Sequence, residues 1–187
     1  MISIIDYKAG NLTSVKLALD ALGVESSITS DPDAIRSADR VVFPGVGAAK
    51  SAMDNLRALG LESVVRECAA SKPFLGICLG MQILFDRSEE DGGTPMLGLI
   101  PGQVRRFPSI PGCKVPQIGW NQVNGGREYY FVHSYYAEIC PYTAGRTGYA
   151  GVEFTSMIKK GRLWACQFHP EKSGRAGLDL MREWLRA

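Results

Sequence analysis

The sequence predicts an α/β protein with a central, mostly parallel sheet flanked by helices. The first observation is that short apolar runs alternate with amphipathic helical patterns along residues 1–85, with short connections between them. This alternation is typical of a parallel sheet, because each crossover helix packs back onto the sheet. The second is that residues 97–168 are rich in glycine, proline and aromatic residues and contain several short apolar runs. These runs predict additional strands, some antiparallel, in the C-terminal half.

The first elements each have a local signal at one end. Residues 1–6 (MISIID) predict a strand, and Asn11 and Thr13 are candidate caps for a helix that ends at Gly23. Residues 24–29 predict a weaker strand. The pair Asp31-Pro32 is typical of a helix start, since proline is well tolerated in the first helical turn.

The following elements complete the parallel sheet. Residues 40–45 (RVVFPG) form a β-branched strand that runs into a glycine loop, and residues 73–77 (PFLGI) form the next strand. Two helical patterns lie between them, with apolar positions at Met53, Leu56, Leu59, Leu61, Val64, Val65 and Cys68. Residues 79–85 (LGMQILF) predict another helix, and an amphipathic helix over residues 174–186 closes the chain.

Length and composition indicate one globular domain over residues 1–187. The chain is long enough to bury a sizeable core, and it has no internal repeat, low-complexity tract or linker. A net charge of +2, without a basic run, argues against nucleic acid as a partner. No apolar segment approaches transmembrane length and no secretory leader is recognisable, so we expect no membrane association and a cytoplasmic location.

The cysteines and histidines give no sign of a metal site. The five cysteines are odd in number and widely spaced, without a CxxC pair, and only two histidines are present. We therefore expect no disulfide framework, no metal and no other cofactor. Four of the thiols are interpreted as structural: Cys68, Cys113, Cys140 and Cys166.

Cys78 differs because it lies between two glycines at a predicted strand-to-helix junction, Gly76-Ile77-Cys78-Leu79-Gly80. This is the form of a nucleophile elbow, in which the flanking residues come too close to neighbouring backbone to carry a Cβ. The helix N-terminus would favour a thiolate, and the backbone N–H of Leu79 would face a developing oxyanion. An ordinary buried thiol is the alternative interpretation.

A second glycine-rich loop, FPGVG at residues 43–47, follows another strand of the same predicted sheet. It should open on the same edge as Cys78, where its backbone N–H groups could add an oxyanion donor. The candidate donors are Gly45, Val46 and Gly47. A plain strand-to-helix turn is the alternative.

The segment Gln167-Phe168-His169-Pro170-Glu171 supplies a candidate base and its orienting carboxylate. A thiolate hydrolase needs a histidine to transfer protons and a group to hold that histidine. Pro170 biases His169 toward extended geometry, in which side chains at i and i+2 share one side. Glu171 is therefore expected to hydrogen-bond the ring of His169. The rival base, His133, lies in an aromatic run without a nearby carboxylate and is interpreted as structural or as part of the substrate wall.

The motifs GICLGMQ, FPGVG and QFHPE together resemble the signatures of class I glutamine amidotransferases. The resemblance covers nearly the whole chain. Further blocks resemble one subgroup, the glutaminase subunits of imidazole glycerol phosphate synthases of histidine biosynthesis: residues 4–15, 114–121 (KVPQIGWN), 129–136 (YYFVHSYY) and 167–174 (QFHPEKSG).

The resemblance implies hydrolysis of glutamine to glutamate and ammonia. Cys78 would attack the side-chain amide, His169 would protonate the leaving ammonia, and water would then hydrolyse the thioester. Gln82 matches a glutamine that contacts the substrate in the family. Ser134 and Tyr135 match a segment that holds the α-groups of glutamine through its backbone.

The resemblance also implies a heterodimer with a (β/α)₈-barrel cyclase subunit. That partner would receive the ammonia and form imidazole glycerol phosphate and an aminoimidazole carboxamide ribonucleotide (AICAR). Asn11 and Trp120 lie in blocks that resemble the docking surface, with a helix cap and a core aromatic as their alternative interpretations. The isolated subunit is expected to hydrolyse glutamine slowly, because a loop such as PGVG can be misoriented until a partner ligand binds.

Three departures from the family pattern concern the expected interface. They are Lys8-Ala9 after the first tyrosine, Gln117 where histidine is usual, and the short segment 124–128. A paralogue that feeds ammonia to a different cyclase-like partner therefore stays an alternative. A cysteine hydrolase of another class and a non-catalytic binding subunit are further alternatives.

Overall fold

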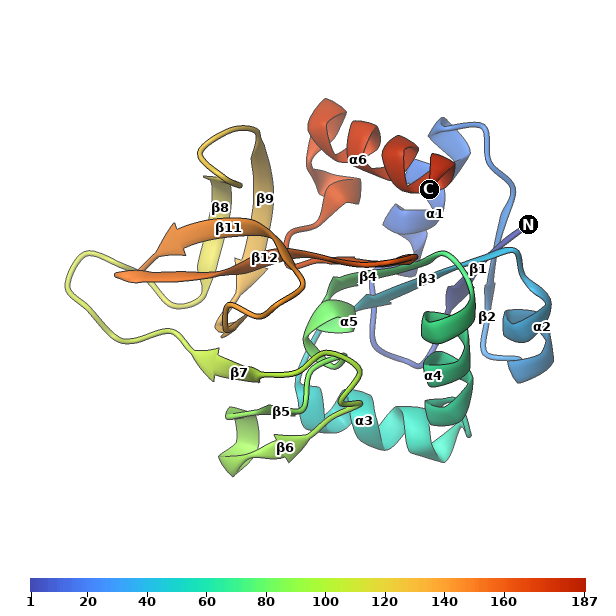
Figure 1. Ribbon diagram of the computed structural model, residues 1–187, viewed down its shortest axis with the longest axis horizontal. Coiled ribbons are helices and arrows are strands. Elements are labelled where there is room, and N and C mark those ends of the chain that lie inside the picture. Colours follow the sequence, from blue (N-terminus) through green and yellow to red (C-terminus); the bar gives the residue numbers. More distant parts are fainter.

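A sheet of eleven strands forms the centre of the molecule, and the computed structural model describes all of residues 1–187 (Figure 1). One half of the sheet is parallel, in the order β2-β1-β3-β4-β13. These strands are β1 (Ile2–Ile5), β2 (Ser26–Thr29), β3 (Arg40–Gly45), β4 (Phe74–Cys78) and β13 (Leu163–Cys166). The predicted α/β class with a mostly parallel centre is confirmed.

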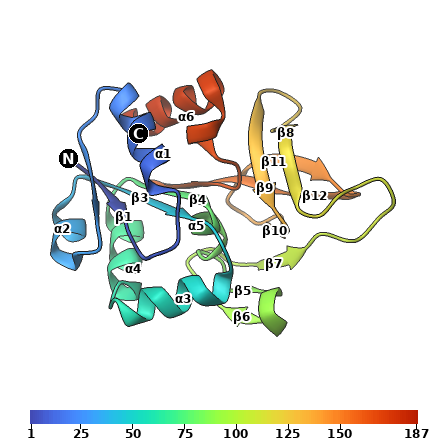
Figure 2. The same cartoon turned by 180° about the vertical axis from the view of Figure 1, so that it is seen from behind.

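The other half of the sheet is mainly antiparallel and continues from β13 in the order β12-β10-β7-β5-β6, with β11 on β12. Its strands are β5 (Arg87–Ser88), β6 (Thr94–Pro95), β7 (Gln103–Arg106), β10 (Tyr135–Ala137), β11 (Thr143–Tyr149) and β12 (Val152–Lys160). Two further strands, β8 (Gln117–Gln122) and β9 (Glu128–His133), pair only with each other. This β8–β9 hairpin lies at the end of the molecule opposite both chain termini (Figure 2).

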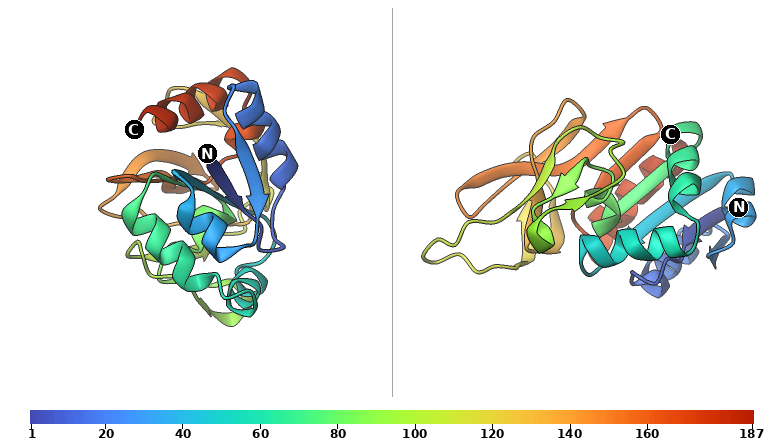
Figure 3. Two further views of the ribbon diagram at one scale, coloured as in Figure 1. Left: turned by 90° about the vertical axis from the view of Figure 1, so that its right-hand side faces the viewer. Right: turned by 90° about the horizontal axis from the view of Figure 1, so that it is seen from below.

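Helices cover both faces of the parallel half (Figure 3). They are α1 (Leu12–Ala21), α2 (Pro32–Ser37), α3 (Ala49–Ala58), α4 (Glu62–Ser71), α5 (Leu79–Gln82) and α6 (Gly174–Arg186), with 3-10 turns η1 (Glu90–Gly92) and η2 (Pro170–Lys172). One core lies between the sheet and α2–α5, and the other lies between the sheet, α1, α6 and the aromatic residues of β9.

The cap signals of the sequence are used as expected. The side chain of Asn11 accepts from the Ser14 backbone N–H at 3.4 Å, and Asp31 accepts from Asp33 N–H at 3.0 Å, so each satisfies a free donor in a first helical turn. The final helix begins at Gly174 and ends at Arg186, and it buries Leu180, Met181 and Trp184.

Two expectations about elements are corrected. The helix predicted over residues 79–85 ends at Gln82, because the chain then turns so that Ile83, Leu84 and Phe85 are buried in the core. The added strands also begin at Arg87 rather than after residue 97, and β8–β9 does not join the central sheet. No helix of the structure has both the length and the apolar character needed to cross a bilayer.

Candidate active site

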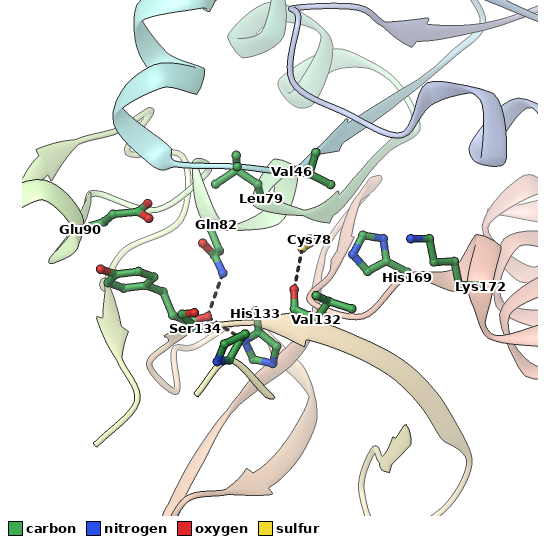
Figure 4. A pocket seen from close by; sticks show the side chains of 13 residues that line it. Val46, Cys78, Leu79, Gln82, Glu90, Val132, His133, Ser134, His169 and Lys172 are labelled. Atoms are coloured by element: carbon green, nitrogen blue, oxygen red, sulfur yellow. Dashed lines mark hydrogen bonds between the residues drawn. The ribbon is translucent and has the colours of Figure 1, made fainter. Parts of the chain in front are cut away.

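A pocket of about 320 Å³ lies at the carboxyl ends of β3 and β4, beside the segment that follows β13 (Figure 4). The carboxyl edge of a parallel sheet is where open α/β folds place their sites. The lining residues come from segments spread over the whole chain: Val46, Gly47, Cys78, Leu79, Gln82, Glu90, Pro116, Val132, His133, Ser134, Tyr135, His169 and Lys172.

Cys78 occupies the turn between β4 and α5 in a strained conformation. Its backbone angles are φ 55° and ψ −113°, which an L-residue rarely adopts. A Cβ on Gly80 would lie 1.9 Å from the Phe43 carbonyl oxygen, and a Cβ on Gly76 would lie 2.9 Å from the Gly80 carbonyl oxygen. Both glycines are therefore required by close backbone approach, as the elbow pattern predicts.

The glycine loop after β3 lies beside Cys78. Gly45 is the register partner of Cys78 in the β3–β4 pair, and a Cβ on Gly45 would lie 2.1 Å from the Tyr7 hydroxyl oxygen. Val46 and Gly47 line the pocket, and Gly47 has a positive φ of 98°. Val46 is apolar but 42% exposed, so its side chain extends into solvent rather than into the core.

His169 and Glu171 form the expected pair. Nδ1 of His169 lies 2.8 Å from Oε1 of Glu171, and both side chains are buried. The backbone differs in detail from the expectation, since only His169 is extended and Pro170–Lys172 forms a 3-10 turn. The turn brings the carboxylate back to the ring without an extended i, i+2 arrangement.

The environment of His169 favours its imidazolium form. Burial by itself lowers the pKa of His169, but hydrogen bonds to Cys78 and Glu171 and their charges together raise it to about 10. An imidazolium next to a cysteine sulfur stabilises the thiolate, which is the nucleophilic form. The structure thus brings Cys78, His169 and Glu171 together in one buried cluster.

His133 has a different role. Burial lowers the pKa of His133 to about 4, so its ring is neutral, and its Nδ1 donates to the Tyr135 carbonyl at 2.7 Å. Nε2 of the neutral ring can then only accept, so the side-chain amide of Gln117, 3.0 Å away, must turn its N–H toward it. His133 is therefore a structural wall residue, as interpreted from the sequence.

The residues expected to contact glutamine lie on one side of Cys78. Gln82 is buried, and its Nε2 donates to the Tyr135 carbonyl at 2.9 Å. Ser134 lies across the pocket from Gln82 (Figure 4), and Tyr135 also lines the pocket.

Two polar residues of the site, Glu90 and Gln167, were not predicted from the sequence. Glu90 lines the far end of the pocket, accepts from the Ala49 backbone N–H at 2.7 Å, and has its pKa raised mainly by burial. No local motif marks it. Gln167 contacts the Cys78 sulfur, and the signal was available, since Gln167 precedes His169 by two residues in QFHPE.

The two candidate docking residues differ in exposure, since Asn11 is half-buried and Trp120 is exposed. Asn11 is the cap of α1, as one interpretation proposed. The interpretation of Trp120 as a core aromatic is wrong, because Trp120 is 56% exposed on β8. Its neighbour Ile118 on the same strand face is 63% exposed.

Comparison with known proteins agrees with this geometry. The family "Glutamine amidotransferase class-I" matches residues 3–186. An imidazole glycerol phosphate synthase subunit HisH from Nitrosococcus oceani is 46% identical over 98% of this chain and 96% of its own length. The HisH subunit of Moorella thermoacetica is 48% identical over 98% of this chain and 93% of its own length.

Solved structures share the fold at lower identity. A crystal structure of a glutamine amidotransferase has a TM-score of 0.76 at 21% identity, covering 99% of this chain and 97% of that chain. PurLQS from Thermotoga maritima has a TM-score of 0.72 at 18% identity, with coverage of 99% and 97%. The chain belongs to the class-I glutamine amidotransferases and, within them, to the family of imidazole glycerol phosphate synthase HisH subunits.

Proposed function

We propose that the protein hydrolyses glutamine to glutamate and ammonia with a Cys78-His169-Glu171 triad. The observation that carries the proposal is the strained Cys78 at the pocket floor, next to an imidazolium held by a buried carboxylate. This is the arrangement of an activated nucleophile, its acid–base partner and an orienting group. Membership of the amidotransferase family selects glutamine among amide substrates.

The reaction takes two steps. Sγ of Cys78 attacks the side-chain amide carbon of glutamine, and a C–S bond forms as the carbonyl oxygen gains negative charge. The C–N bond then breaks, the nitrogen takes the proton of His169, and ammonia leaves a γ-glutamyl thioester. In the second step His169 takes a proton from water, the water oxygen attacks the thioester, and glutamate and the Cys78 sulfur are released.

Backbone N–H groups would stabilise the oxyanion in both steps. Leu79 is the first residue of α5, and the N–H groups in a first helical turn have no intrahelical acceptor. The loop of Gly45, Val46 and Gly47 is adjacent to Cys78 and would supply a second donor. Loss of one such donor typically raises a barrier by about 3–4 kcal/mol.

The pocket also suggests how glutamine is oriented. Glu90 and Gln82 lie on the side of Cys78 away from His169 (Figure 4). The Glu90 carboxylate would hold the α-ammonium group there, while backbone groups of Ser134 and Tyr135 hold the other α-substituents. The amide then reaches Cys78, and ammonia leaves near His169 and Lys172.

The protein would pass its ammonia to a cyclase subunit that forms imidazole glycerol phosphate and AICAR. A docked partner fits the chemistry, because free ammonia is mostly ammonium at neutral pH and is then no longer nucleophilic. The exposed Ile118 and Trp120 on β8 support a docking face beside the pocket. We assign a (β/α)₈ barrel to the partner by analogy with the family.

Measurement of ammonia and glutamate release tests the proposal. The chain is assayed alone and with a co-expressed cyclase subunit, and the acyl-enzyme is trapped by acid quench and detected as a mass increase on the Cys78 peptide. Cys78→Ala should abolish both signals. Equal glutamine hydrolysis by Cys78→Ala would refute the triad, whereas activity on peptides but not on glutamine would favour a cysteine hydrolase of another class.

A further inference from the structure

Gln167 is a buried polar residue that the triad mechanism leaves unused. It follows β13, has no exposed surface, and its backbone N–H donates to the Ser156 carbonyl at 2.9 Å. It does not line the pocket, whereas Cys78 does. Gln167 therefore approaches the Cys78 sulfur from the protein interior, behind the face that a substrate would meet.

The side chain of Gln167 joins two site residues. Nε2 lies 3.7 Å from Sγ of Cys78, and Oε1 accepts from Nε2 of Gln82 at 2.9 Å. The nitrogen of the buried Gln167 amide therefore contacts Cys78, and its oxygen contacts Gln82.

The hydrogen-bond network determines which end of each amide faces the sulfur. The Tyr135 carbonyl can only accept, so the Gln82 atom 2.9 Å away must be the amide nitrogen. The same nitrogen faces Gln167, so the Gln167 atom that meets it must be the acceptor oxygen. The remaining end of Gln167, directed at Sγ, is therefore an N–H donor.

The far end of this network is rigidly held. The Tyr135 carbonyl accepts a second hydrogen bond from Nδ1 of the neutral, buried His133 at 2.7 Å. His133 is itself held by Gln117 on β8. The Gln167 amide cannot rotate its oxygen toward the sulfur without breaking contacts to Gln82.

We propose that Gln167 is a positioning residue that donates a hydrogen bond to the Cys78 thiolate from its buried side and holds the sulfur for attack. This inference rests on the proposed function of Cys78 and extends it. A thiolate gains more from an N–H donor than a neutral thiol does, since hydrogen bonds to charged groups are the stronger ones. On its other side the sulfur faces the pocket, where the Val132 carbonyl oxygen lies 3.8 Å away (Figure 4).

Replacement of the donor separates this role from ordinary packing. Gln167→Leu removes both polar ends with similar volume, and Gln167→Glu keeps an acceptor for Gln82 but replaces the donor toward Sγ by a carboxylate oxygen. Ser156→Ala is the matched control, because Ser156 is fully buried next to Gln167 and its hydroxyl has no partner. The probe is iodoacetamide, and alkylation is followed on the Cys78 peptide by mass spectrometry from pH 5 to pH 10.

Other ionisable groups near the nucleophile remain the same in all variants. The ionisable groups that interact with Cys78 or line the pocket with it are Tyr7, Glu90, His133, Tyr135, Cys166, His169 and Lys172, and Glu171 contacts His169. A shift of the alkylation profile in Gln167→Leu, which adds no charge, therefore reports loss of the Gln167 contact, whereas Gln167→Glu adds the repulsion of a carboxylate.

Both Gln167 variants should raise the pH midpoint of Cys78 alkylation by about one unit or more, a tenfold change in the thiol–thiolate equilibrium. Ser156→Ala should leave the midpoint unchanged. For glutamine hydrolysis, Gln167→Glu should lower kcat about tenfold with KM changed less than twofold. A midpoint within 0.3 units of wild type in folded Gln167→Leu would overturn the proposal and leave Gln167 as a structural amide.

A measurement on the unmutated chain covers the case in which the variants do not fold. The side-chain amide ¹H–¹⁵N signal of Gln167 should titrate together with Cys78 and shift on its alkylation. A signal constant through the Cys78 midpoint would also overturn the proposal. Neither readout needs glutamine turnover, so failure of the proposed hydrolysis, seen with the wild-type chain, is distinguished from failure of the Gln167 contact.

Discussion

His169 Nδ1 lies 2.8 Å from Oε1 of Glu171, although the two residues are joined through the first residue of a 3-10 turn. This contact directs the other ring nitrogen away from the carboxylate and contributes to the raised pKa of His169. The second carboxylate oxygen, Oε2, is buried without a partner, so the carboxylate interacts chiefly with the ring.

Neutralising Glu171 should impair catalysis more than folding. In Glu171→Gln the ring loses a negative neighbour, the pKa of His169 falls, and the imidazolium that protonates ammonia is less populated. We expect kcat to fall roughly 10²–10⁴-fold, the range of general acid–base contributions. Steady-state glutaminase kinetics with thermal unfolding of the same sample checks this, and a loss below threefold would contradict it.

His169 and His133 should make the free energy of unfolding depend on pH in opposite directions. The folded pKa of His169 is raised to about 10 from 6.5, so its contribution is fully present below pH 6.5 and is lost as the pH rises toward 10. The folded pKa of His133 is lowered to about 4 from 6.5, so its protonation in the unfolded chain destabilises the fold as the pH falls from 6.5 to 4.

Measuring the free energy of unfolding in urea from pH 4 to pH 10 tests both pH dependences. His133→Asn should remove an acid-side loss of up to about 3 kcal/mol, which corresponds to the lowering of the pKa of His133 from 6.5 to about 4. The same variant should keep the loss of stability between pH 6.5 and pH 10 that His169 causes. If His133→Asn loses as much stability between pH 6.5 and pH 4 as the wild type does, groups other than His133 cause that loss.

Gly80→Ala should destabilise the elbow strongly. The added Cβ would lie 1.9 Å from the Phe43 carbonyl oxygen, which belongs to the backbone of β3 and cannot move aside independently. We expect a loss of about 3 kcal/mol or more in the free energy of unfolding, together with loss of glutaminase activity. Gly148→Ala is the control, because no atom lies within 4 Å of its Cβ position, and it should change stability by less than about 1 kcal/mol.

Truncation of Trp120 should weaken partner binding without affecting the isolated chain. Its side chain is 56% exposed, so Trp120→Ala creates no core cavity, but an aromatic anchor at an interface typically contributes about 2 kcal/mol or more. Calorimetric titration with the cyclase subunit should show at least a tenfold weaker Kd. Ile28→Ala, an exposed apolar site on β2, is the control and should bind normally. Equal affinities of the two variants would exclude this docking face.

Partner binding should raise glutamine turnover. Val46 is exposed and Gly47 has a positive φ, so the loop can reorient its N–H groups without disturbing the core. The isolated chain should turn over slowly, and the complex with the ligand of the cyclase should be faster by about 10²-fold, the effect of one oxyanion donor. High turnover of the isolated chain would show that the oxyanion site is already formed.

Local sequence patterns predicted what depends on neighbours in the chain. The parallel half of the sheet, the caps at Asn11 and Asp31, the elbow glycines and the His169–Glu171 pair all follow from spacing over a few residues. The helix after Cys78 was predicted too long because its apolar residues suit a buried turn as well as a helix. Trp120 was ambiguous because hydrophobicity alone does not separate a core from an exposed contact face.

The sequence by itself determined the fold class and the family, and it singled out Cys78, His169 and Glu171 as the proposed triad. Only the tertiary structure decided how the rest of the site is assembled. Gln82 is 53 residues from Tyr135 and 85 residues from Gln167, yet the three residues form one hydrogen-bonded chain that ends at the Cys78 sulfur. Such contacts depend on which strands end at the same sheet edge, and no spacing along the chain encodes them.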